Sequence, residues 1–245
     1  MNLKQVYQAV LIELEKQKAP SMLLDEFNYY YYKSVIQYIN TKYNFCDMNQ
    51  QEDDDLRVLN MTATLSGGNI ISKDDDKTLF TLPSDYFHLK NCVITFNNPN
   101  AKCNSNSIIK KGARRLTSDK YPGILNNYYF KPSYKTPYYY IYNDDSGQIK
   151  TGTPVIIKLF YGEDKNINIS DISIDYIKYP NELSLTVNDL ESEDEILEDL
   201  EFPKYVCYEI INIMVKLFLE RHRDPRLNTN PIVNQTIAPP ISPNK

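Results

Sequence analysis

The chain has 245 residues, of which 42% are hydrophobic, and its 27 basic and 32 acidic residues give a net charge of −5. This composition predicts a domain with a sizeable core, and no apolar run approaches the roughly 20 residues that a membrane-spanning helix needs, so we expect no contact with a membrane. The N-terminus lacks the pattern of a secretory signal peptide, which favours folding in a cytoplasm. The four cysteines form no CxxC pair, and this favours free buried thiols over a disulfide or metal site at Cys46, Cys92, Cys103 and Cys207.

Two helices are predicted at the N-terminus. Apolar residues from Leu3 to Leu14 recur at helical spacing, with Asn2 as the N-cap and Pro20 beyond the end. A second helix, with Ser21 as its N-cap, is predicted to fade near Asn44. The short link between them favours packing as a helical hairpin.

The middle of the chain has the composition of a sheet. Runs of β-branched and aromatic residues, bounded by Asn, Asp, Gly or Pro, occur at residues 78–82, 92–96, 138–142, 155–161 and 172–179. We expect them to form one antiparallel sheet. Pro132 and Pro137 make the segment before the third run an edge or a loop, because proline cannot donate to a ladder.

The C-terminal part contains an acidic stretch, a very apolar helix and a proline-rich tail. Residues 189–201 carry no basic residue and predict either a helix start or a solvated linker. Residues 202–226 form a helix with one narrow polar line, which is more apolar surface than a small domain usually covers alone. The tail, 227–245, is either disordered or extended across a partner, and its candidate anchors are Ile232, Val233, Ile237 and Ile241.

These patterns predict an α+β fold in which helices from both chain ends form a bundle around an inserted antiparallel β-rich region. The expected parts are N-terminal bundle helices at 1–45, the β-rich insertion at 46–188, the acidic segment with the C-terminal bundle helix at 189–226, and the extended tail at 227–245.

Catalytic chemistry is not indicated. There are only two histidines, His88 and His222, for which structural roles are favoured, and no P-loop, nucleophile elbow or zinc-protease motif occurs. The acidic runs 53–55 and 74–76 lack the alternating ligands of a calcium loop, so solvated loops are favoured over a metal site and a metal-dependent hydrolase is the least favoured reading. We expect no enzyme activity, no cofactor and no bound metal.

A basic interval in the middle of the chain has several interpretations. Lys110, Lys111, Arg114 and Arg115 lie in it, and tyrosines are interleaved. Basic and aromatic residues together can follow a nucleic-acid backbone and stack bases, so a nucleic-acid or glycan-binding module is the alternative function. The same four residues are candidate contacts to the acidic stretch of a neighbouring subunit, or a solvated face.

The order of several weak motifs along the chain resembles a known family. The segment LPSDYFHL occupies 82–89, Arg114 and Arg115 precede the strand that begins at Pro137, IDYIKYP ends at Pro180, and Phe202-Pro203 begins a helix that contains Cys207 and Glu209. This order is similar to that of the head-to-tail adaptor or neck-ring proteins of tailed bacteriophages, most closely those of crAss-like phages. The similarity spans nearly the whole chain.

The resemblance implies a virion structural protein, assembled in the host cytoplasm into a ring, commonly a dodecamer, below the portal. Its expected partners are further copies of itself, the portal protein, neighbouring tail ring proteins and, without sequence preference, the packaged DNA. The family has no catalytic residues to transfer to this chain.

Overall fold

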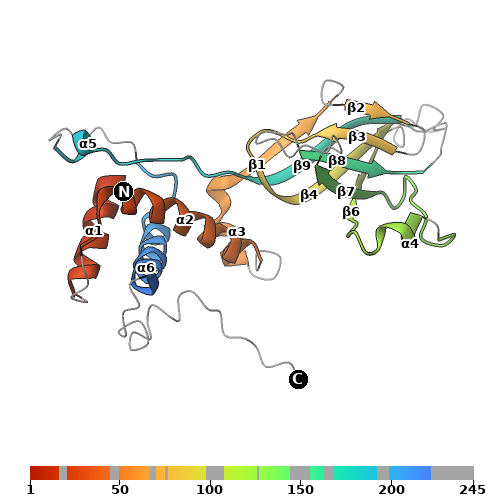
Figure 1. The fold of residues 1–245 in the computed structure, drawn as a ribbon. Coiled ribbons are helices and arrows are strands. Elements are labelled where there is room, and N and C mark those ends of the chain that lie inside the picture. Colours follow the sequence, from red (N-terminus) through yellow and green to blue (C-terminus); the bar gives the residue numbers. More distant parts are fainter. Residues whose placement is uncertain are drawn as a thin grey trace. The chain divides into compact units, whose positions relative to one another are not determined.

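The computed structural model describes residues 1–16, 21–44, 50–66, 70–74, 77–97, 108–125, 127–143, 155–162, 168–191 and 199–221. The chain divides into two compact units, one made of Met1–Val58 with Pro180–Lys245 and the other of Leu59–Tyr179 (Figure 1). Within the described residues there are six α-helices and two β-sheets, which confirms the mixed α+β class.

Helix α1, Leu3–Lys16, begins as the sequence predicts. The side-chain oxygen of Asn2 accepts a hydrogen bond from the Gln5 backbone N–H at 2.9 Å, and the Gln5 side chain accepts one from the Asn2 N–H at 3.2 Å. This reciprocal pair satisfies two N–H groups that the helix itself leaves without partners.

Helix α2, Leu24–Tyr43, ends close to Asn44 as predicted, but the prediction of Ser21 as its N-cap is wrong. The extended residue Leu23 precedes the helix, and its N–H donates to the Glu26 carboxylate at 3.4 Å. The Glu26 carboxylate therefore accepts from the N–H of the N-cap residue, and its negative charge lies in the first turn, where the helix dipole favours it.

Helix α6, Lys204–Arg221, contacts both α1 and α2 (Figure 1). Aromatic rings take part in this packing, with Tyr30 and Phe218 at a centroid distance of 6.0 Å. The helix buries Val206, Cys207, Ile210, Ile211, Ile213, Met214, Val215, Phe218 and Leu219. The N-terminal helices α1 and α2 cover much of α6, while Tyr205 and Tyr208 stay 50% and 49% exposed, so the need for cover beyond one small domain stays a prediction.

Residues 53–55 lie in helix α3, Gln50–Asp55, so the prediction of a solvated acidic loop at this place is wrong. Asp55 is only 2% exposed, and its carboxylate lies 3.0 Å from the Lys42 ammonium, which is also 3.3 Å from the Glu209 carboxylate. The end of the acidic run is thus tied to α2 and α6. The remaining helix of this unit, α5, spans Val187–Glu191.

The second unit contains a four-stranded antiparallel sheet in the order β1-β9-β4-β5. Its strands are β1, Asn60–Leu65, β9, Asn168–Lys178, β4, Tyr86–Asn97, and β5, Ile108–Gly112. A five-stranded sheet has the order β2-β3-β8-β7-β6. Its strands are β2, Ile70–Lys73, β3, Lys77–Thr81, β8, Val155–Phe160, β7, Tyr138–Asn143, and β6, Arg114–Arg115.

All five predicted strands are present, but the prediction of a single antiparallel sheet is wrong. Two sheets share one apolar core, and β6 pairs with β7 in parallel. The core joins β4 and β9 of one sheet to β3, β7 and β8 of the other through side chains such as Ile94, Ile174, Phe80, Tyr139 and Ile157. Each sheet buries one face against the other, because a single open sheet would leave that face exposed to water.

Candidate functional site

The structure places the four predicted basic residues on two edge strands that follow each other in the chain. Lys110 and Lys111 lie on β5, the edge of the four-stranded sheet, and Arg114 and Arg115 form β6, the edge of the five-stranded sheet. All four are exposed. The chain changes sheets at Ala113, whose N–H donates to the Cys92 carbonyl at 2.8 Å, so the four charges are held on a fixed backbone.

Arg115 also affects the pKa of His88, the one histidine that the structure describes. Burial lowers the pKa of His88, and the charge of Arg115 lowers it further. The His88 ring packs against that of Phe87 at a centroid distance of 4.1 Å. A half-buried imidazole with a lowered pKa, packed on another aromatic ring, fits the predicted structural role, whereas His222 lies outside the described residues.

A second exposed feature is the aromatic turn, defined as Tyr128, Tyr129 and Phe130, whose exposed fractions are 90%, 87% and 61%. The side-chain oxygen of Asn127 accepts hydrogen bonds from the N–H groups of Tyr129 and Phe130, at 2.9 and 3.4 Å. This Asx-type arrangement fixes the backbone while the three rings point into solvent. Sequence reasoning noted the tyrosines but missed the turn, for which the preceding asparagine was the available signal.

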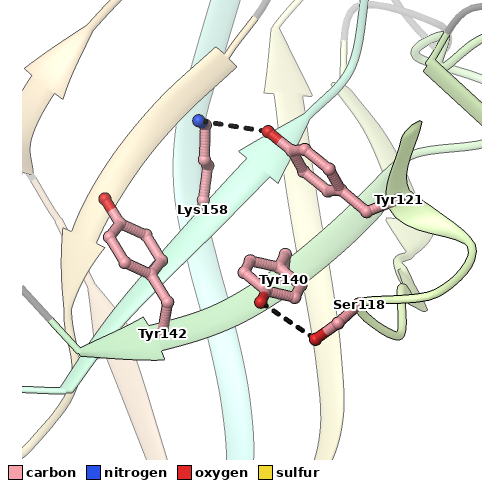
Figure 2. A pocket seen from close by; sticks show the side chains of 5 residues that line it. All are labelled: Ser118, Tyr121, Tyr140, Tyr142 and Lys158. Atoms are coloured by element: carbon pink, nitrogen blue, oxygen red, sulfur yellow. Dashed lines mark hydrogen bonds between the residues drawn. The ribbon is translucent and has the colours of Figure 1, made fainter. Parts of the chain in front are cut away.

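A third feature is a hollow of about 280 Å³ on the five-stranded sheet, called the tyrosine pocket, lined by Ser118, Tyr121, Tyr140, Tyr142 and Lys158 (Figure 2). Tyr140 and Tyr142 come from β7, and Lys158 is the direct cross-strand partner of Tyr140 on β8. Ser118 and Tyr121 come from the segment that leads into α4, Tyr121–Leu125. The strands predicted at 138–142 and 155–161 contain Tyr140, Tyr142 and Lys158, but the sequence did not indicate that these side chains line a pocket.

The other predicted positions contribute less. Ile232, Val233, Ile237 and Ile241 lie outside the described residues, as does most of the acidic stretch. At its described ends, Asp189 accepts hydrogen bonds from the N–H and hydroxyl of Thr186, and Asp199 pairs with the N-terminal ammonium at 2.9 Å. These acidic groups therefore have local roles in the helical unit.

Cys92 and Cys207 are buried free thiols, as the sequence predicts, while Cys46 and Cys103 lie outside the described residues. Across the described ranges, no three side chains of the metal-ligating types come together. None of the described helices is long and apolar enough to cross a membrane.

Comparison with protein-family models finds no match to the chain, and comparison with curated proteins finds no match either.

Proposed function

We propose that the chain is a virion structural protein that forms an oligomeric ring in the head-to-tail connector of a tailed phage, where it joins the portal to the tail and surrounds the DNA channel. The motif order described above supports this proposal. So do the α+β class and the division of the chain into one unit with helices from both chain ends and a second, strand-rich unit formed by the segment between them. Such a protein needs surfaces that only neighbouring subunits cover.

The aromatic turn is the observation that carries the proposal. Three adjacent large aromatic side chains stay 61–90% exposed although their backbone is fixed by Asn127. Contiguous exposed apolar surface of this kind is typical of protein–protein interfaces, and aromatic residues are enriched at such interfaces. In the proposed ring, the turn packs against the next subunit.

The basic edge strands, β5 and β6, are also consistent with the proposed ring. Their exposed charges face either an acidic surface of the adjacent subunit or the phosphates of DNA in the channel. In a head-to-tail ring, each subunit presents both surfaces of a heterologous contact, so one chain supplies both partners.

The experiment is removal of the aromatic turn with Tyr128→Ser, Tyr129→Ser and Phe130→Ser together. We expect the thermal unfolding of the single chain to stay nearly unchanged, because the three side chains are exposed, and the fraction of closed oligomer in native mass spectrometry to fall. Ile12→Ser, which removes an apolar side chain that is 53% exposed on α1, is the control. Oligomers that persist unchanged in the triple variant would exclude the turn from the interface.

A further inference from the structure

The tyrosine pocket has an outer wall that is separate from the core between the sheets. Tyr139 and Ile157 point into that core, whereas Tyr140 and Lys158, the next residues on their strands, lie on the opposite face. A small cluster of Leu116, Tyr138 and Phe160, with Tyr121 packed against it, fixes the loop before α4 on this outer face. The pocket therefore lies between a sheet surface and an anchored loop.

Aromatic rings form most of the lining. The rings of Tyr140 and Tyr142 are nearly parallel, at 18° and a centroid distance of 6.2 Å, and the Tyr121 ring is 5.3 Å from that of Tyr140. The volume of about 280 Å³ lies just below the usual range for ligand pockets, roughly 300–1,000 Å³, and has room for one ring-sized group. Flat ring faces in a hollow of this size suit a planar group that stacks.

Lys158 supplies a cation without a carboxylate partner in the described part of the chain. Its ammonium lies 3.4 Å from the Tyr121 hydroxyl and over the Phe160 ring at 5.3 Å, and both of these partners are neutral. The nearest acidic residue along the loop, Asp119, is engaged by Thr117 and by the backbone of its own turn. An ammonium group has three donors, so Lys158 keeps the capacity to bind an anionic group.

Two further basic residues, Arg114 and Lys120, add positive charge around the pocket. Arg114 of β6 is in register with Tyr138 of β7, one strand from the pocket, and Lys120 is exposed in the loop that carries Ser118. Among the described residues, no amide or carboxylate side chain lines the pocket, so the side chains that pair with the edges of adenine and cytosine are absent from this lining. Three tyrosine rings and one lysine therefore favour stacking and phosphate contact over selection of a particular base.

We infer that the tyrosine pocket binds single-stranded nucleic acid without base specificity, with a base stacked on the tyrosine rings and a phosphate held by Lys158. Stacking on aromatic side chains combined with a basic path for the backbone is the general mode of such binding. The site lies within one chain, so the inference does not depend on ring formation. It differs from contact with duplex DNA, whose bases are already stacked on each other.

The test is fluorescence anisotropy of a short labelled oligodeoxythymidylate with the full chain at low salt. Lys158→Gln should weaken binding about fivefold or more, and Tyr140→Leu by about five- to 150-fold, whereas Tyr140→Phe should retain most of the affinity. Lys77→Gln is the matched control, since Lys77 lies on β3 of the same sheet, pairs with Asp74 at 3.3 Å and does not line the pocket. If Tyr140→Leu does not fold, Tyr142→Leu replaces it.

Four results would overturn the inference. They are the absence of binding at low salt, equal affinities of Lys158→Gln and Lys77→Gln, binding of duplex as tight as that of the single strand, and binding of an acidic oligosaccharide in place of the oligonucleotide. Similar affinities for oligodeoxythymidylate and oligodeoxyadenylate, both falling as salt rises, are the expected pattern.

Discussion

Lys42 is the charged residue that joins three helices of the first unit. Its ammonium pairs with Asp55 of α3 and Glu209 of α6, and it lies over the Tyr38 ring, 5.4 Å from the ring centroid. The Asp55 side chain is buried, and the Lys42 ammonium lies 3.0 Å from its carboxylate. Removal of one member of such a pair leaves a buried charge without compensation, which costs more than the pair contributes.

We therefore expect Lys42→Met to lower the free energy of unfolding, measured by urea denaturation, by about 1–3 kcal/mol or more. Methionine keeps the apolar stem of the side chain but lacks the charge. Lys216→Met is the control, because Lys216 lies 3.9 Å from Glu220, whose side chain is 45% exposed, and such pairs are worth about 0–1 kcal/mol. Equal losses in the two variants would contradict the role given to Lys42.

Tyr176 gives the second unit a pH dependence in the alkaline range. Its hydroxyl donates to both oxygens of the Asp85 carboxylate, at 3.0 and 3.2 Å, and burial together with this bond raises its pKa to about 12. An unfolded tyrosine has a pKa of about 10, so between these values the folded chain holds a proton that the unfolded chain has lost. Its contribution to stability is complete below about pH 10 and is lost as the pH rises towards 12.

The variant Tyr176→Phe should show a shallower fall of unfolding free energy than the original chain in this window. Burial also raises the pKa of the Cys92 thiol to about 12, but both proteins retain that group, so their difference isolates the tyrosine. Tyr128→Phe, at an exposed side chain, should leave the slope unchanged. Parallel pH profiles for the original chain and Tyr176→Phe would show that the bond to Asp85 carries no such linkage.

At the scale of elements, α6 provides a graded comparison of core and partly buried positions. Ile211 is 2% exposed, whereas Leu217 is only partly buried. We expect Ile211→Ala to cost about 2–5 kcal/mol of unfolding free energy, as a large-to-small change in a core does, and Leu217→Ala to cost clearly less. A loss below about 0.5 kcal/mol for Ile211→Ala would remove that residue from the core.

The sequence predicts those elements whose own residues alternate or repeat with a clear period. Helices α1, α2 and α6, and the buried strands β3, β4, β7, β8 and β9, are of this kind. Strands β1, β2, β5 and β6 are short or mostly exposed, so their residues carry little alternation, and they exist because a neighbouring strand offers backbone partners. Their pairing is tertiary information that a local pattern does not contain.

The tyrosine pocket was missed for a related reason. Tyr140 and Lys158 become neighbours only through the register of β7 against β8, and Ser118 and Tyr121 join them only because Leu116 anchors the loop on Tyr138 and Phe160. The run of tyrosines in β7 was visible in the sequence. Nothing in that run indicates which of them share a face with a lysine of β8.

For the whole molecule, the net charge of −5 conceals an uneven distribution. The exposed basic edge strands and the acidic stretch at 189–201 carry opposite signs. Arg114→Glu with Arg115→Glu should reduce ring formation if these residues meet a neighbouring subunit, and reversal of acidic residues in 189–201 should then partly restore it. If they face DNA, rings should form normally while genome retention by assembled virions falls. Normal rings with normal retention would mean that these arginines form only a solvated surface.

The most direct test of the proposed ring is the native mass of the purified protein. One chain has a mass of 28.6 kDa, and the proposal predicts a discrete closed oligomer of many such chains, whose mass does not grow with concentration. A single 28.6 kDa species that persists at high protein concentration would contradict it, as would a continuous series of open aggregates.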